Sequence, residues 1–265
     1  MESNTIDLKI TSIFEKHKDV NKKNQVKKNN LYDFHILPNH PSRALFSGPS
    51  GSGKTNLLIN LLITKHFLFN YYDTIHVFSP SYANDDSFRI FEKLYSKILP
   101  NGLVSKKIKT EIKIHPKVEE DIILDVIDSQ AKYIEEHDID KSDKILMIFD
   151  DCINEKVMKG KAITSLFFRG RHVNCSIWVT TQSYMKLDRS LRLQLTNVFV
   201  FSPSPSEVKR LVDEQRNSSV SASQLESIIV YATKKKNDFL HINKQCEQCD
   251  QFRKGLDELV IIEEK

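Results

Sequence analysis

The residues with the most specific chemistry in this chain are Gly48 to Thr55, which read GPSGSGKT. This run fits G-x-x-x-x-G-K-[ST], the phosphate-binding P-loop. Gly48, Gly51 and Gly53 allow the backbone to fold tightly and bring its N–H groups close to phosphate oxygens. A helix that begins near Gly53 would turn its positive end toward the same anion. The run therefore predicts a binding site for the phosphates of a nucleotide.

Two side chains of this loop have defined roles in such a site. Lys54 can reach the β- and γ-phosphates, and the Thr55 hydroxyl can ligate Mg²⁺. The strand-like run RALFS precedes the loop and the apolar run NLLINLLI follows it, so strand, loop and helix come in the expected order. We assign nucleotide binding to Gly48, Pro49, Ser50, Gly51, Ser52, Gly53, Lys54, Thr55 and Asn56.

A second candidate site feature is a pair of carboxylates after the apolar run KILMIF. In P-loop enzymes an acidic residue at the end of such a strand holds Mg²⁺, directly or through water. We assign that role to Asp150, and to Asp151 the role of orienting and polarising the attacking water. Neighbouring carboxylates resist simultaneous ionisation unless a cation is present, so bound Mg²⁺ would stabilise the pair. The alternative is an aspartate that caps a helix or turn.

A polar residue also ends the apolar run CSIWVTT. Gln182 at that position can sit between the γ-phosphate and the attacking water and respond to hydrolysis. The alternative is that Gln182 only solvates the end of a strand.

Arginines precede the same run, in the segment FFRGRH. The guanidinium of Arg169 or Arg171 can neutralise the charge that develops on a transferred phosphoryl group. An arginine supplied by a neighbouring subunit would couple hydrolysis to ring assembly. The alternative for each arginine is a surface or salt-bridge role, and Arg189 and Arg192 are lesser candidates.

Strand-like and helix-like segments alternate along the chain. The predicted strands are Arg43–Ser47, Tyr72–Ser79, Ile112–Ile114, Lys144–Phe149, Cys175–Thr181, Asn197–Phe201 and Phe239–Asn243. The predicted helices are Asn56–Ile63, Ser87–Leu99, Val118–Glu136, Ile163–Arg171, Ser204–Gln215 and Ser223–Thr233. This alternation predicts an α/β fold whose mostly parallel sheet is covered by helices on both faces. Helical spacing in the second helix predicts a buried face of Ile90, Phe91, Leu94 and Ile98.

Composition sets the limits of the interpretation. The chain has 265 residues, enough for one large α/β domain or a domain with extensions. A formal net charge of +4 permits a nucleic-acid partner without proving one. We expect neither a secretion signal nor a membrane segment, because no apolar run is long enough. Four cysteines in a chain of this length favour a reducing compartment over a disulfide scaffold.

We predict three parts in the chain. Residues 1–30 form a basic, flexible N-terminal arm, because the run Glu15–Asn30 has six lysines and almost nothing apolar. The arm is either a solvated tail or a contact to DNA phosphates or a neighbouring subunit. Residues 31–245 form the P-loop ATPase domain, and residues 246–265 form a C-terminal extension.

A zinc site is not expected in the C-terminal part. Cys246 and Cys249 form C-E-Q-C, with His241 five residues earlier. A zinc site needs four ligands, and no second pair exists, so we expect free thiols. His35, His40 and His115 have no obvious partners in the sequence.

The ordered series GPSGSGKT, KILMIFDD, FFRGRH, VTTQS and SLRLQLTNVFVF resembles a known family. It looks like the genome-packaging ATPases of large double-stranded DNA viruses, the poxvirus-type members of the FtsK–HerA superfamily that also occur in virophages. The resemblance covers roughly Leu31 to Glu214. The P-loop is common to many families, and the run from FFRGRH through Gln182 is more selective. Many relatives have Asp-Glu where this chain has Asp150 and Asp151.

The resemblance implies a RecA-like (ASCE) P-loop NTPase with an extra strand between the P-loop strand and the acidic strand. It implies ATP hydrolysis with Mg²⁺, coupled to translocation of double-stranded DNA into a capsid. By motif, Lys54 and Thr55 match the phosphate and Mg²⁺ residues, Asp150 and Asp151 the acidic pair, Gln182 the sensor, and Arg169 or Arg171 the arginine finger. Implied partners are non-specifically bound DNA, further copies in a ring, and capsid vertex proteins. The implied location is the host cytoplasm, in a virus factory, or the virion.

Other P-loop functions remain as alternatives. A GTPase would need an N-K-x-D motif, but Asn243 and Lys244 are followed by Gln and Cys. A small-molecule kinase would not need a glutamine at the end of the strand. A nucleotide-binding or assembly protein that does not hydrolyse ATP should lack the acidic pair. DNA-stimulated ATPase activity would separate a motor from these alternatives.

Overall fold

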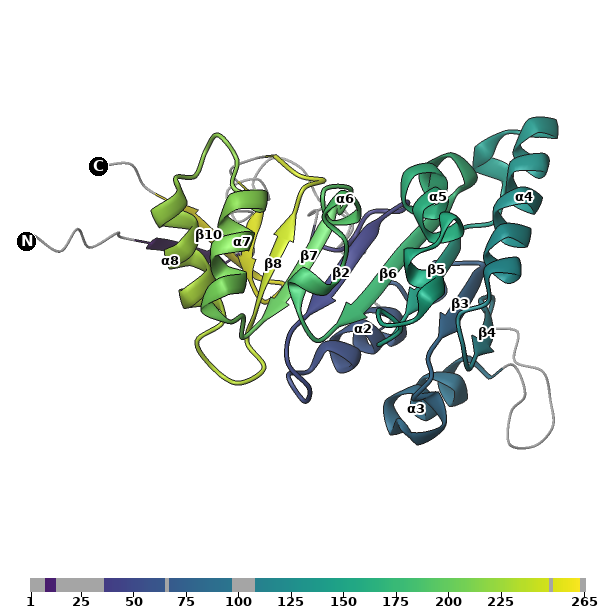
Figure 1. The fold of residues 1–265 in the computed structure, drawn as a ribbon, viewed down its shortest axis with the longest axis horizontal. Coiled ribbons are helices and arrows are strands. Elements are labelled where there is room, and N and C mark those ends of the chain that lie inside the picture. Colours follow the sequence, from purple (N-terminus) through teal and green to yellow (C-terminus); the bar gives the residue numbers. More distant parts are fainter. Residues whose placement is uncertain (1–7, 13–35, 65–66, 97–107, 248–249, 263–265) are drawn as a thin grey trace, which may run out of the picture.

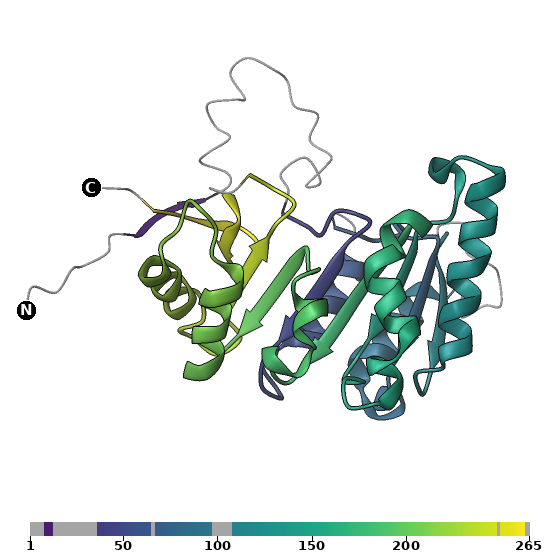
Figure 2. The same cartoon turned by 45° about the horizontal axis from the view of Figure 1, so that its top comes forward.

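A ten-stranded sheet runs through the whole molecule (Figures 1 and 2). The structure, a computed structural model, describes residues 8–12, 36–64, 67–96, 108–247 and 250–262. The strand order is β1-β10-β9-β8-β7-β2-β6-β5-β3-β4. The parallel strands are β2 (Arg43–Ser47), β3 (Thr74–Phe78), β4 (Glu111–His115), β5 (Ile145–Phe149), β6 (Cys175–Thr181) and β7 (Asn197–Phe201). The antiparallel strands are β8 (Phe239–Asn243), β9 (Phe252–Lys254), β10 (Glu258–Ile262) and β1 (Leu8–Ser12).

Helices cover both faces of this sheet, which confirms the predicted α/β architecture (Figure 1). One face carries α4 (Glu120–Glu136), α5 (Lys161–Arg169), α7 (Pro205–Gln215) and α8 (Ala222–Ala232). The other face carries α2 (Lys54–Ile63) and α3 (Asp86–Tyr95). Shorter elements are η3 (Tyr82–Asn84), η4 (Ile139–Lys141), η5 (Lys156–Lys159), η6 (Gly170–Val173), η7 (Tyr184–Lys186) and α6 (Arg189–Arg192). No helix in the described ranges has the length and apolar character needed to cross a membrane.

The central strands are apolar because both of their faces are covered. Every residue of β5, β6 and β7 is buried, as in parallel sheets with helices on both sides. Side chains alternate between two cores along β2, with Leu45 in one and Phe46 in the other. Phe46 stacks on Phe199 with ring centroids 4.5 Å apart, which fixes β2 against β7.

The predicted buried face of α3 is wrong in part. Phe88, Phe91 and Tyr95 are buried, whereas Ile90 is 53% exposed and Leu94 is 46% exposed. The helix has one aliphatic row and one aromatic row, and the aromatic row packs on α2. The Tyr95 hydroxyl of this row also donates a hydrogen bond to the carbonyl of Leu62 on α2. Ile98 lies outside the described residues.

Helix α5 ends two residues earlier than predicted, at Arg169, and the chain continues as the 3₁₀ turn η6. A glycine permits close packing at this junction. A Cβ atom on Gly170 would lie 3.0 Å from the carbonyl oxygen of Cys175, the first residue of β6. The turn therefore approaches the start of β6 closely, and it places Arg169 and Arg171 at that end of the strand.

The sheet continues past residue 245, where we expected the ATPase domain to end. Strand β9 pairs with β8, β10 pairs with β9, and β1 pairs with β10 from Leu8↔Ile262 to Ser12↔Glu258. Part of the expected C-terminal extension and five residues of the expected arm thus belong to the sheet. Residues 13–35, which hold the lysine-rich run, lie outside the described part of the chain.

Candidate nucleotide-binding site

The P-loop connects the carboxyl end of β2 to the start of α2, as predicted. Helix α2 begins at Lys54, and Gly53 caps it with a left-handed φ of 100°. Gly48 and Gly51 also have positive φ, 155° and 72°. The N–H of Gly48 donates to the carbonyl of Thr181 at 3.1 Å, which ties the loop to β6. The N-terminus of α2 faces the loop, so its N–H groups are available to an anion.

Gly48 is enclosed by β7. A Cβ atom at this position would lie 2.6 Å from the carbonyl oxygen of Phe201 and 2.7 Å from its Cβ. No such crowding exists at Gly51, where a Cβ atom would have no neighbour within 4 Å. The first glycine of the motif is therefore required by packing as well as by its backbone angle.

Lys54 is half-buried and bonds to the loop itself. Its Nζ donates to the carbonyl oxygens of Gly48 at 2.8 Å and of Pro49 at 2.9 Å. Burial lowers the pKa of Lys54, and the nearby carboxylates of Asp151 and Asp150 act in the opposite direction. The ammonium is thus held at the mouth of the loop, where a phosphate can replace the carbonyl oxygens.

Asp150 is the most enclosed acidic group of the site, with an exposed fraction of 3%. Its Oδ1 accepts from Thr180 Oγ1 at 2.7 Å and lies 3.4 Å from Thr55 Oγ1, while Oδ2 accepts from Ser79 at 3.3 Å. Burial raises the pKa of Asp150, the carboxylates of Asp85 and Asp151 act in the same direction, and the hydroxyl donors oppose them. A bound cation would relieve this cost of burial.

Asp151 points into the open side of the cleft. Its backbone is left-handed, with φ 52°, and its N–H donates to Thr180 Oγ1 at 2.9 Å. Gln182 Nε2 lies 3.2 Å from Asp151 Oδ2 and 3.4 Å from Oδ1. Both side chains are exposed, so a water molecule can reach them. Strand β6 lies between β2 and β5, which brings Gln182 between the P-loop and the acidic pair.

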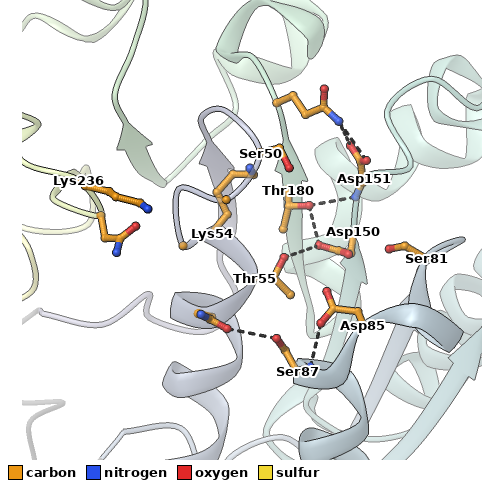
Figure 3. A pocket seen from close by; sticks show the side chains of 15 residues that line it. Ser50, Lys54, Thr55, Ser81, Asp85, Ser87, Asp150, Asp151, Thr180 and Lys236 are labelled. Atoms are coloured by element: carbon orange, nitrogen blue, oxygen red, sulfur yellow. Dashed lines mark hydrogen bonds between the residues drawn. The ribbon is translucent and has the colours of Figure 1, made fainter.

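The cleft that these residues share has a volume of about 450 Å³, within the range of small-molecule sites (Figure 3). Nine of the residues assigned from sequence line it: Ser50, Gly51, Gly53, Lys54, Thr55, Asn56, Asp150, Asp151 and Gln182. Sequence reasoning missed Ser81, Asp85, Ser87, Thr180, Lys236 and Asn237, which also line it. The serines and Asp85 follow β3, which neighbours β5, and ligand sites in such sheets lie beyond the carboxyl ends of strands.

The arginines of FFRGRH lie near the amino end of β6, whereas the cleft lies beyond the carboxyl ends of the strands. Arg169 and Arg171 precede β6, whereas the P-loop follows β2, which is parallel to β6. The seven residues of β6 separate its amino end from its carboxyl end by roughly 20 Å. Both arginines are exposed, and Arg171 Nε lies 3.1 Å from His172 Nε2. Neither arginine reaches the cleft of its own chain.

Arg192, a lesser candidate for the same role, has a structural position. It is buried and forms two 2.8 Å contacts with Glu214, through Nε and Nη2. Breaking such a buried pair costs about 3–5 kcal/mol, so this arginine holds α6 on α7. Arg189 is largely exposed and lies 3.8 Å from Glu214.

The remaining histidines and cysteines form no metal site in the described ranges. His40 does have partners, contrary to expectation. Its Nδ1 lies 2.7 Å from Ser176 Oγ and its Nε2 lies 2.7 Å from Asn174 Oδ1. His115 stacks on Phe78 at 4.6 Å. Cys246 lies 3.0 Å from the carbonyl of Asn243, and Cys249 and His35 fall outside the described residues.

This arrangement can bind a polyphosphate, hold a divalent cation and position a water molecule. The loop offers N–H donors and an ammonium, Thr55 and Asp150 offer oxygen ligands, and Asp151 and Gln182 face the open cleft. Hard cations such as Mg²⁺ take oxygen ligands and keep several waters, which fits a threonine and a single carboxylate.

Comparison with known proteins gives a family and several relatives. The family described as "Poxvirus A32 protein" matches residues 28–252. The DNA packaging protein OPG160 of Variola virus is 29% identical over 176 residues, which are 65% of this chain and 57% of that protein. The OPG160 protein of Monkeypox virus is 27% identical over 172 residues, which are 65% of this chain and 51% of that protein. The chain thus spans about half the length of the curated relatives it matches.

Solved structures share the fold at low sequence identity. The DNA-packaging ATPase B204 from Sulfolobus turreted icosahedral virus superposes with a TM-score of 0.52 at 14% identity, covering 86% of this chain and all of B204. It supports the fold assigned above.

Proposed function

The chain belongs to the poxvirus A32 protein family, and we propose that it is an ATPase that drives a viral double-stranded DNA genome into a capsid. The single observation that carries this proposal is the convergence of the P-loop, Asp150–Asp151 and Gln182 on one cleft. The names of the Variola and Monkeypox relatives, DNA packaging proteins, support the DNA substrate.

Nucleotide binding rests on the loop and the acidic strand. The N–H groups at the start of α2 and the Lys54 ammonium would hold the β- and γ-phosphates. Thr55 and Asp150 would hold Mg²⁺, since their oxygens lie 3.4 Å apart on one side of the loop. Bound Mg²⁺ would neutralise phosphate charge. Thr180 and Ser79 keep the Asp150 carboxylate oriented toward Thr55.

Hydrolysis needs a water molecule aligned with the γ-phosphate. Asp151 would accept a proton from that water. Gln182 would orient the Asp151 carboxylate and the water relative to each other. The exposed position of both side chains suits this role, because the attacking water comes from solvent.

A ring of subunits would complete the site. Arg169 and Arg171 lie at the end of β6 opposite to the P-loop of their own chain. Either arginine could therefore act only on the nucleotide of a neighbouring copy. An arginine supplied in trans stabilises the charge on the transferred phosphoryl group. Double-stranded DNA would bind non-specifically through phosphate contacts, and capsid vertex proteins are the further partners we expect. The site of action would be a virus factory or the virion.

The alternative is a P-loop nucleotide-binding protein or a small-molecule kinase without DNA translocation. A kinase would transfer the γ-phosphate to a second substrate and would not respond to DNA. The water-facing pair of Asp151 and Gln182 favours hydrolysis.

The test is steady-state ATP hydrolysis with and without double-stranded DNA of random sequence. We expect DNA to raise turnover, and added salt to abolish the increase because phosphate contacts are screened. Lys54→Ala should remove both the basal and the stimulated activity. A rate of ATP hydrolysis that DNA does not change at low salt would contradict the proposed function.

A further inference from the structure

The nucleotide cleft has a wall that comes from the C-terminal part of the chain. The turn between α8 and β8 contributes Lys236 and Asn237 to the lining of the cleft. Figure 3 shows Lys236 on the same side of the cleft as Lys54. We propose that this turn binds the nucleoside monophosphate end of the nucleotide, with the Lys236 ammonium on the α-phosphate. The proposal rests on the proposed function of the cleft as an ATP site.

The positions of the other charged groups give the direction of the nucleotide. Asp150 and Asp151 lie on one side of Lys54, and Lys236 lies on the other side and points toward the loop (Figure 3). The acidic pair and Lys54 fix the end of the nucleotide that carries the β- and γ-phosphates. The α-phosphate and ribose must therefore extend away from the acidic pair, along the wall that carries Lys236.

The donors of this wall are available to a ligand. Lys236 and Asn237 make no hydrogen bond or ion pair with the described residues, and both are exposed. The neighbouring residue, Asp238, is engaged with Lys254 at 3.5 Å. An ammonium that lines a cleft with no carboxylate partner is suited to a phosphate.

The turn is also held in a fixed place against the P-loop. Asn237 has a left-handed φ of 68°, and the N–H of Asp238 donates to the carbonyl of Lys235 at 3.1 Å. A Cβ atom on Gly53 would lie 3.8 Å from Asn237 Oδ1, so the turn lies close to the loop.

Strand β9 supplies the anchor for this turn. Lys254 bonds to Asp238 and its Nζ lies 5.0 Å from the centre of the Tyr231 ring on α8. Residues beyond 245 thereby position one wall of the nucleotide site.

The test compares the binding of ADP and AMP by calorimetry in the full chain. Lys236→Ala should weaken both ligands by about the same factor, roughly 10–100-fold, the loss of one charge-assisted hydrogen bond. Lys54→Ala should weaken ADP much more than AMP, because AMP lacks the phosphates that Lys54 holds. Lys235→Ala, on the same exposed turn but outside the cleft, should leave both affinities unchanged.

A second variant checks the anchor. Lys254→Ala should weaken ADP and AMP by a smaller, equal factor, since Lys236 is present but its turn is released. If Lys236→Ala binds both ligands like Lys235→Ala while Lys54→Ala loses ADP, the cleft is a nucleotide site and the proposed role of the turn is wrong. The proposed role of the turn is also wrong if Lys236→Ala weakens DNA binding and leaves ADP and AMP binding unchanged. If the unaltered protein binds neither ligand, the proposed ATP site fails together with this inference.

Discussion

Gln182 donates a hydrogen bond from Nε2 to the Asp151 carboxylate, 3.2 Å from Oδ2. The two residues follow neighbouring parallel strands, β6 and β5, so the sheet itself sets their separation. In the proposed mechanism Asp151 activates the water and Gln182 lies near the γ-phosphate, so this contact would link the state of the nucleotide to catalysis. We therefore propose that the pair is the part of the cleft most directly concerned with hydrolysis.

Replacing Asp151 tests this assignment. Asp151→Asn should slow turnover by about 10²–10⁴-fold, the range for loss of a general base, while ATP still binds. Turnover and nucleotide affinity should be measured together, with Asp128→Asn on the exposed side of α4 as the matched control. An equal loss of Mg²⁺-dependent ATP binding would make Asp151 a metal ligand instead.

The arginines are tested by mixing two inactive variants. An Arg171→Ala subunit keeps its own P-loop, and a Lys54→Ala subunit keeps its own arginine. In mixed rings some interfaces pair an intact loop with an intact arginine, so activity should partly return. An arginine finger contributes about 10³–10⁵-fold in related phosphoryl transfer, so the recovery should be measurable.

The same mixing should be run with Arg169→Ala, because both arginines lie at the same end of β6. Lys161→Ala, exposed at the start of α5, is the control that should not lose activity alone. Mixed rings that form and stay inactive with both arginine variants would show that no finger is donated in trans.

The first two glycines of the loop should differ in their effect on stability. Gly51→Ala should cost about 1–2 kcal/mol, the penalty of a left-handed alanine, because nothing lies within 4 Å of its Cβ. Gly48→Ala should cost more, since its Cβ would lie 2.6 Å from the carbonyl oxygen of Phe201. Urea unfolding of both variants measures the difference, and equal losses would contradict the crowding at Gly48.

Buried histidines should make the fold sensitive to mild acid. Burial lowers the pKa of His76 to about 4, with His115 and Lys113 acting in the same direction, and lowers that of His241 to about 3, with Arg253. The unfolded chain takes up protons below its ordinary value of 6.5, whereas the folded chain does not. Stability is therefore full above pH 6.5 and should fall as the pH drops toward the folded values.

Each such histidine contributes a slope of about 1.4 kcal/mol per pH unit in this window. Urea unfolding between pH 7 and 5 should show the decline, and His241→Gln should make it shallower. A slope that His241→Gln does not alter would show that His241 is protonated in the folded protein.

The motifs of this site could be read from sequence because their chemistry is local. Strand, loop and helix around GPSGSGKT follow one another in the chain, and Asp150 and Gln182 each end a buried strand. Parallel pairing then brings strand ends to one edge, which predicts their meeting without knowledge of the strand order.

The parts that could not be read depend on distant pairing. Lys236 reaches the cleft only because β8 pairs antiparallel with β7, and no local pattern of KKKND indicates that. Arg192 looks like the other arginines in the sequence, and only Glu214, 22 residues away, reveals it as structural. The exposed row of α3 was misassigned because aliphatic and aromatic rows compete at helical spacing.

The most direct test of the central claim is movement along DNA driven by ATP. A linear duplex that carries a labelled third strand is incubated with the protein, and release of that strand is followed with time. We predict release with ATP, and none with a non-hydrolysable analogue or with Lys54→Ala. DNA-stimulated hydrolysis with the third strand still bound would contradict translocation and would leave a nucleotide hydrolase that only binds DNA.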